Sequence, residues 1–133
     1  MAVERTAVNP WTWSVEMGYS QGEIVSGHTR TLYCAGQTAM SRDGKPRHAG
    51  DMAAQLALSV DNLEAVLDEA GMSLVDLVRL NVYTTDVDLL FQHYGVLASR
   101  LGAAGVAPTT TMLGVTRLAL PTLMVELEGA AVA

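Results

Sequence analysis

The chain has 133 residues and a mass of 14.1 kDa, so we expect one domain over residues 1–133 with too little chain for two cores. Half of the residues are hydrophobic, 17% are charged and the mean hydropathy is +0.24, which excludes intrinsic disorder. The 8 Lys and Arg residues against 14 Asp and Glu residues leave a net charge of −6, and no stretch concentrates the basic residues. The charge therefore disfavours DNA and RNA as partners.

Cysteine usage and the N-terminus favour a cytoplasmic protein. The single Cys34 cannot form an internal disulfide, and its neighbours Tyr33 and Ala35 do not activate a thiol, so we expect a buried core residue. The N-terminus has an acidic residue, Glu4, where a signal peptide needs a basic one. The most apolar stretch is interrupted by proline, glycine and glutamate, so no membrane-spanning segment is expected.

The first third of the chain is predicted to form a loop and then a β-hairpin. The loop carries Asn9-Pro10-Trp11, and residues 23–26 and 31–35 read as two short strands that pair around Gly27-His28. Residues 41–46 are dense in turn formers and end this β region.

Two helices and three strands are predicted next. Apolar residues recur at helical spacing from the N-cap Asp51 to Gly71. Residues 78–83 alternate as a strand does, and a second helix runs from Asp86 to Gly102 with Phe91 and Tyr94 on its apolar face. Residues 111–116 and 123–132 form two strands joined at Pro121. The order β-β-α-β-α-β-β predicts an α+β fold, a sheet with two helices on one face.

The other face of this sheet is predicted to pack against further copies of the chain. In the last strand Met124, Glu126, Glu128 and Ala130 alternate with a fully apolar set, and Met112 is expected on the same face in the neighbouring strand. A face that is partly apolar and has no helix of its own favours a homo-oligomer.

The candidate catalytic residue is Glu126. His28, His48 and His93 lack metal-ligand spacing, so no metal is expected, and nucleotide-binding motifs are absent, so no cofactor is expected. A carboxylate among apolar residues is costly unless it is paired or shifted toward its neutral form, which makes Glu126 a candidate general acid or base. The alternative is that Glu126 or Glu128 pairs with Arg79 or Arg117 on a neighbouring strand.

Taken together, several segments resemble the YjgF/Rid family, the reactive intermediate imine/enamine deaminases or RidA-like proteins. The resemblance spans nearly the whole chain, and its order and spacing are specific. The segments that carry it are Gly18-Tyr19-Ser20-Gln21-Gly22, Ala35-Gly36-Gln37, Asp61-Asn62-Leu63, Ala70-Gly71-Met72, Val82-Tyr83-Thr84-Thr85-Asp86, Tyr94, Pro108 through Leu118, Pro121 and Val125-Glu126-Leu127-Glu128.

The resemblance implies a chorismate-mutase-like α+β fold with a mixed sheet, and a homotrimer whose clefts between subunits hydrolyse imines and enamines. Tyr19 and Glu126 fall on pocket positions of the family. The carboxylate-binding Arg is replaced by Thr110, the Cys that follows it by Met112, and the Ser before the Gly-Gln pair by Ala35. A hydroxyl cannot replace a guanidinium as a carboxylate anchor, so the chain resembles a divergent branch that acts poorly on 2-aminoacrylate.

Two functions remain open from the sequence. The first is an enzyme that uses Glu126 as general acid/base on a small imine, enamine or related carbonyl compound, by hydrolysis, deamination or tautomerisation. The second is a non-catalytic trimer that binds a small molecule. Arg30, Arg79 and Arg117 are the residues that could replace the missing pocket arginine.

Overall fold

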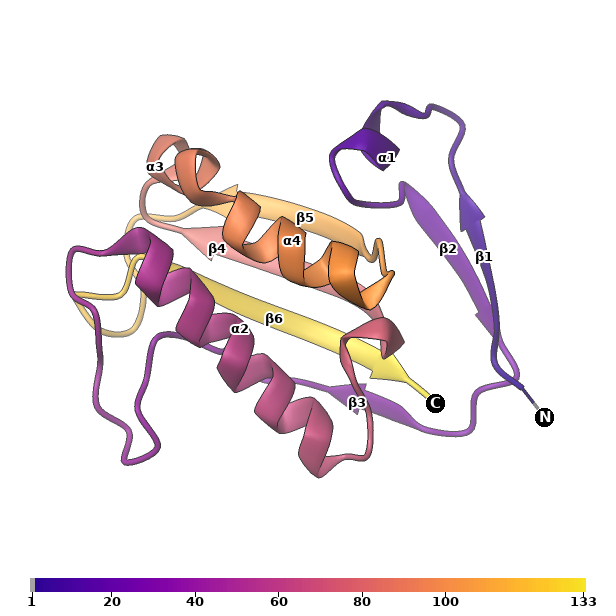
Figure 1. Ribbon diagram of the computed structural model, residues 1–133, viewed down its shortest axis with the longest axis horizontal. Helices are drawn as coiled ribbons and strands as arrows, with labels where there is room; N and C mark the ends of the chain where they lie inside the picture. The colour runs from indigo at the N-terminus through magenta and orange to yellow at the C-terminus, as the bar shows by residue number, and fades with distance from the viewer. Residues whose placement is uncertain (1) are drawn as a thin grey trace.

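A computed structural model describes residues 2–133 (Figure 1). Its N-terminal part contains β1 (Glu4–Val8), α1 (Trp13–Glu16) and β2 (Gly22–Ser26). The rest of the chain forms β3 (Thr31–Tyr33), α2 (Met52–Glu69), the 3-10 helix η1 (Leu74–Asp76), β4 (Leu77–Thr84), α3 (Val87–His93), α4 (Gly95–Ala104), β5 (Thr109–Gly114) and β6 (Val125–Val132).

The main sheet has four strands in the order β3-β6-β4-β5. β6 pairs antiparallel with β3 and β4, whereas β4 and β5 are parallel, so the sheet is mixed. The helices α2, α3 and α4 lie together on one side of this sheet (Figure 1). The predicted α+β fold with helices on one face is confirmed.

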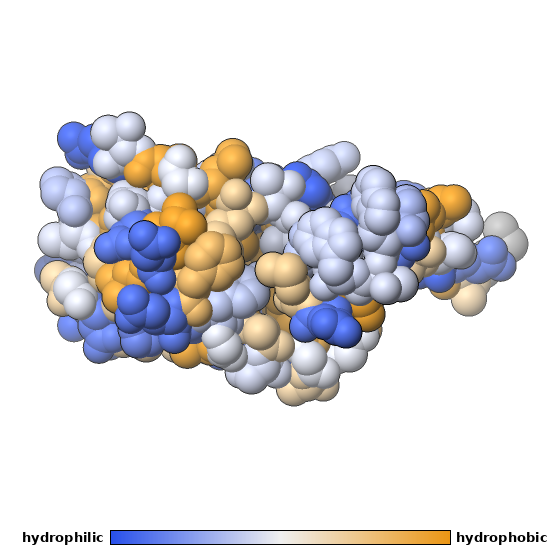
Figure 2. Space-filling view, turned by 90° about the horizontal axis from the view of Figure 1, so that it is seen from above, coloured by the Kyte–Doolittle hydropathy of each residue, from blue (hydrophilic) through white to orange (hydrophobic). Residues whose placement is uncertain are grey.

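The predicted hairpin of residues 23–26 and 31–35 is wrong. β2 pairs with β1 in a separate two-stranded sheet, and β3 pairs with β6. The sequence predicts a loop in place of β1 because the connection to β2 is long and contains α1, so no tight-turn motif marks the pair. Arg5 fixes this N-terminal hairpin, since its guanidinium donates to both oxygens of Glu23 at 2.9 and 2.8 Å and to the Leu77 carbonyl at 2.7 Å. Figure 2 shows the hairpin as a narrow arm at the right of the molecule.

Helix α2 follows its prediction closely. The Asp51 carboxylate accepts a hydrogen bond from the Ala54 amide at 3.0 Å, and Gly71 takes a left-handed φ of +72° just beyond the helix. The apolar stripe of α2 is buried against the sheet, with Leu56, Val60 and Leu67 fully enclosed.

The second predicted helix is divided and ends later than expected. Tyr94 joins α3 to α4, and Gly95 starts α4, which fits the low helix propensity of glycine. The left-handed residue that closes α4 is Gly105 (φ +71°) and not Gly102. Phe91, predicted on the apolar face, is 54% exposed.

The main sheet buries only the side that faces the helices. Leu80, Val82, Val125 and Leu127 are fully buried there. The opposite side, here called the uncovered face, has no helix over it within residues 2–133 and carries Thr31, Tyr33, Arg79, Asn81, Tyr83, Thr109, Thr111, Leu113, Glu126, Glu128 and Ala130. Among the helices of residues 2–133, none is long and apolar enough to cross a membrane.

Candidate functional site

A group of hydrogen-bonded polar side chains lies on the uncovered face, where β4 and β6 pair. Asn81 is opposite Glu128 in the register, and Tyr83 is opposite Glu126. Glu128 Oε1 accepts hydrogen bonds from Asn81 Nδ2 at 2.9 Å and from the Tyr83 hydroxyl at 2.8 Å. These two bonds, that of Asn81 first, lower the pKa of Glu128, so this carboxylate is ionised at neutral pH.

Glu126 differs from Glu128 although the two are neighbours on one strand face. Its carboxylate is half-buried and has no hydrogen bond or ion pair with any residue from 2 to 133. Burial raises the pKa of Glu126, and the nearby charge of Glu128 raises it further. The predicted pairing of either glutamate with Arg79 or Arg117 is not found among the described residues.

Gly36 provides the space for the Glu126 carboxylate. A Cβ placed on Gly36 would lie 2.6 Å from Glu126 Cδ, which real Cβ atoms do not tolerate. The segment is held beside β6 because the Cys34 amide donates to the Gly129 carbonyl and Gln37 pairs with Leu127. Ala35 is exposed in this segment, and Cys34 is buried, with burial raising the pKa of its thiol.

Tyr19, Thr110 and Met112 lie in a different place, around a cavity of about 530 Å³. We call it the aromatic cavity; it is lined by Tyr19, Phe91, Tyr94, Ala98, Thr110 and Met112, with Glu16 and Met17 from the end of α1. The Thr110 hydroxyl donates to the Pro108 carbonyl at 2.8 Å. Burial raises the pKa of the Tyr94 phenol, with a smaller contribution from Tyr19.

Met112 is not on the face that the sequence predicted. It is in register with Val82, and Thr110 with Leu80, both on the buried side of β4. Met112 and Met124 pack against the core. The prediction paired β5 with β6, whereas β4 lies between these two strands. The side chains of β5 therefore align with those of β4, and Met112 lies on the same face as Val82. One copy of the chain therefore holds Glu126 on one side of the sheet and Thr110 on the other.

The three candidate arginines have distinct positions. Arg79 is on the uncovered face, where its Nη2 donates to Thr111 Oγ1 at 2.7 Å, and it lines a cavity of about 240 Å³ with Asn81 and Glu128. Arg30 donates to the Ala70 carbonyl beyond α2, and Arg117 to the Leu118 carbonyl in the connection before β6. Arg79 is therefore the candidate that shares the uncovered face with the two glutamates.

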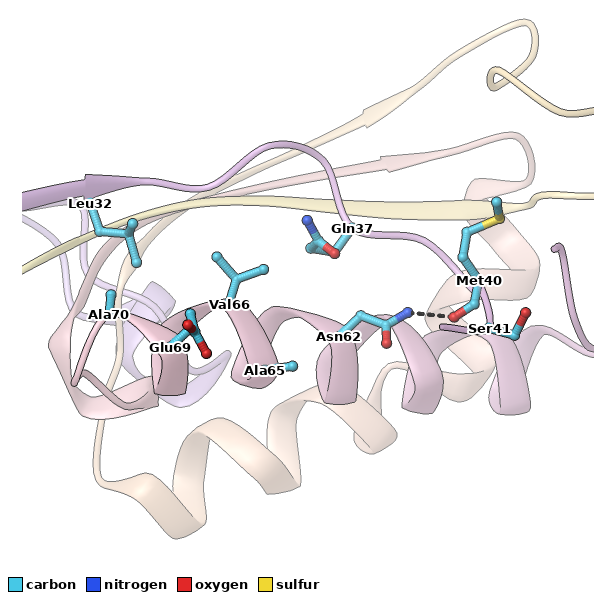
Figure 3. Close-up of a pocket in the computed structure, with 9 residues that line it drawn as sticks. All are labelled: Leu32, Gln37, Met40, Ser41, Asn62, Ala65, Val66, Glu69 and Ala70. Atoms are coloured by element: carbon cyan, nitrogen blue, oxygen red, sulfur yellow. Dashed lines mark hydrogen bonds between the residues drawn. The ribbon is translucent and has the colours of Figure 1, made fainter. Parts of the chain in front are cut away.

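A larger cavity, about 650 Å³, lies between α2 and residues 37–41 (Figure 3). Asn62 Nδ2 donates to the carbonyls of Met40 at 2.9 Å and Thr38 at 2.8 Å, so its amide holds the loop against the helix. None of the predicted site residues is in this cavity. Within residues 2–133, no group of three or more His, Cys, Asp or Glu side chains is placed to hold a metal ion.

Asn81 and Tyr83 are site residues that the sequence reasoning did not single out. The alternation of buried residues along β4 could have indicated them, because it places Arg79, Asn81 and Tyr83 on the face away from the buried Leu80 and Val82. Their bonds to Glu128 depend on the pairing of β4 with β6, which no local pattern reveals.

The chain is similar to several known proteins. The family model described as Endoribonuclease L-PSP matches residues 12–133. RutC family protein YjgH of Escherichia coli (strain K12) is 34% identical over 120 residues, which is 88% of each chain. A crystal structure of a protein of unknown function of the Rid family, YyfB from Yersinia pestis, is 32% identical with a TM-score of 0.83, over 97% of this chain and 98% of that one. Serine-bound TdcF of E. coli is 26% identical with a TM-score of 0.70, over 86% of this chain and 87% of that one.

These matches agree with the fold and with the resemblance of the sequence segments. The chain belongs to the YjgF/Rid family.

Proposed function

We propose that this protein is a Rid-family enzyme that acts on a small imine, enamine or related carbonyl compound, with Glu126 as general acid/base. The observation that carries the proposal is the state of Glu126: a half-buried carboxylate, unpaired among residues 2–133, whose pKa is raised by burial and by Glu128. A carboxyl group of this kind exchanges a proton near neutral pH more readily than an ordinary surface glutamate.

Such a group supports hydrolysis of a C=N bond. Water adds to the carbon of the protonated imine while the ionised Glu126 takes the proton that the water loses, which gives a neutral carbinolamine. Glu126 then returns this proton to the nitrogen, and the C–N bond breaks as the carbinol hydroxyl releases its proton to solvent, which gives a carbonyl compound and ammonia or an amine. For an enamine, Glu126 first protonates the carbon, which produces the protonated imine and leaves Glu126 ionised.

We propose that the active form is a homotrimer with its clefts between subunits. Tyr33 and Leu113 on the uncovered face are 82% and 51% exposed, so this face offers large apolar side chains that further copies of the chain would cover. Glu126 and the aromatic cavity lie on opposite sides of one sheet, so a cleft that uses both needs the cavity of one copy and the glutamate of another. Symmetric self-association provides this arrangement.

A small-molecule ligand is supported by one relative, since TdcF was solved with bound serine. The matched family model carries the name of an endoribonuclease, but the net charge of −6 without a basic cluster disfavours RNA as the substrate here.

A second candidate is a trimer that binds a small molecule without turnover. The Thr110 hydroxyl favours it, because this group occupies the position of the family's arginine and already donates to the Pro108 carbonyl. A protein that kept the family's cleft but lost the arginine that binds the substrate carboxylate would have such a neutral group at this position.

The test is a panel of imines and enamines, with and without a carboxylate, assayed for release of ammonia or amine. We expect turnover of at least one carboxylate-free compound, 2-aminoacrylate to be a poor substrate, and Glu126→Gln to reduce turnover by roughly 10²–10⁴-fold. The melting temperature of the same preparation is the control for folding. Unchanged turnover in the folded variant would remove Glu126 from the mechanism, and ligand binding without any turnover would favour the second candidate.

A further inference from the structure

The walls of the aromatic cavity are apolar apart from a few neutral hydroxyls and the carboxylate of Glu16. The rings of Tyr19, Phe91 and Tyr94 enclose it together with Met112, and its volume of about 530 Å³ is in the range of small-molecule sites. Tyr19 is further oriented by Trp13, whose ring meets it edge-on at a centroid distance of 6.1 Å.

The charges around the cavity are unfavourable for an anion. Among the lining residues of the described chain, Glu16 is the one charged side chain. Arg100, on α4, is engaged elsewhere by ion pairs with Asp61 at 3.0 Å and Glu64 at 3.1 Å. A carboxylate that entered would lose its hydration without gaining a cation, whereas a protonated nitrogen would meet aromatic ring faces and a carboxylate at the rim.

Apart from Glu16, the polar groups that could contact a ligand are neutral. Within residues 2–133 the hydroxyls of Tyr19 and Tyr94 have no hydrogen-bond partner, and the raised pKa of Tyr94 keeps its phenol protonated. The Thr110 hydroxyl donates to Pro108 and retains only its acceptor capacity. These groups can bind a nitrogen or a carbonyl oxygen but cannot balance a full negative charge.

We propose that the aromatic cavity binds the aromatic ring or branched alkyl group of a compound that has a neutral or protonated nitrogen and no carboxylate. This inference rests on the proposed function for the reaction at Glu126, since it names the class of imine or amine that would be the substrate or product. The binding preference itself does not depend on turnover.

The experiment compares benzylamine, benzyl alcohol and benzoate, in which the ring is constant and the charge changes. Binding is measured by thermal shift and by tryptophan fluorescence, because Trp13 contacts Tyr19. We expect benzylamine and benzyl alcohol to bind at least about tenfold more tightly than benzoate. Thr110→Arg should reverse this order by introducing a charge-assisted partner for benzoate.

Phe91→Ala tests the cavity directly. Phe91 is 54% exposed, so its truncation should leave the fold intact while it weakens benzylamine binding. Ile24→Ala, at a 61% exposed position on β2, is the matched control and should change nothing.

Three results would overturn the inference: wild-type protein that binds benzoate as well as benzylamine, no binding of any of the three compounds, or benzylamine binding that Phe91→Ala leaves unchanged. The same titrations with Glu126→Gln separate this inference from the proposed function. Retained benzylamine binding together with unchanged imine turnover in Glu126→Gln would overturn only the proposed catalytic role of Glu126.

Discussion

The Tyr83 hydroxyl donates a 2.8 Å hydrogen bond to Glu128, the carboxylate that neighbours Glu126 on the uncovered face. This bond and that of Asn81 keep Glu128 ionised, and the charge of Glu128 in turn raises the pKa of Glu126. The two glutamates of β6 are thus an ionised carboxylate and a neighbour whose proton is held more tightly.

Tyr83→Phe tests this relationship. Removal of the hydroxyl takes away one of the two bonds to Glu128, so the pKa of Glu128 should rise toward its ordinary value while the bond from Asn81 remains. Carboxyl carbon NMR titration of the wild type and the variant measures the change. Tyr33→Phe, at an exposed tyrosine on the same face, is the control. A Glu128 titration that is identical in all three proteins would contradict the assignment.

The stability of the protein should depend on pH in opposite ways at the two glutamates. The pKa of Glu126 is raised above 4.5 in the folded chain, so its favourable contribution is complete below that pH and is lost as the pH rises through the folded value. Glu126→Gln cannot ionise and does not suffer this loss. The free energy of unfolding of the variant, minus that of wild type, should therefore increase as the pH rises above 4.5.

For Glu128 the sign is reversed. Its folded pKa is lowered below 4.5, so its contribution is present above that pH and is lost as the pH falls through the folded value. Glu128→Gln should be less stable than wild type at neutral pH, and the difference should shrink in acid. Urea denaturation at several pH values measures both variants, and equal slopes for the two would refute the distinction.

Gly36→Ala should displace Glu126 without unfolding the chain. The added Cβ meets the end of a flexible side chain, so the carboxylate moves away and the backbone does not have to. We expect a lower pKa for Glu126, because displacement exposes it to water, and a loss of any turnover. Gly102→Ala, where a Cβ has open space in α4, is the matched control and should change neither property. A Glu126 titration in Gly36→Ala that matches wild type would show that the close approach is unimportant.

The proposed trimer predicts a mass near three times 14.1 kDa in dilute solution by light scattering. Leu113→Asp places a charge on the uncovered face and should dissociate the assembly. Ser99→Asp, at an exposed position of α4, places the same charge away from that face and should leave the assembly intact. A wild-type monomer would refute the assembly and the cleft between subunits with it.

Local patterns predict the helices and the faces of β6 well, because spacing, caps and alternation are properties of neighbouring residues. Asp51 and Gly71 mark the ends of α2, and Glu126 lies opposite the buried Val125 and Leu127 as expected. Strand partners are set by contacts distant in the sequence. The pairing of β2 with β1 and the position of β4 between β5 and β6 could not be read from the chain, and Met112 was assigned to the wrong face for this reason.

The aromatic cavity has walls from two parts of the chain, the connection between β1 and β2 and the main sheet with its helices. Met17 and Tyr19 belong to the N-terminal hairpin's connection, whereas Thr110 and Met112 belong to β5 of the main sheet. A molecule that fills the cavity therefore contacts both parts of the chain. Its binding free energy adds to the stabilisation that Arg5 provides when it docks the hairpin against the main sheet. Ligand binding and hairpin docking are thermodynamically linked, so occupancy of the cavity should slow hydrogen exchange at the amides of β1 and β2, far from the ligand itself.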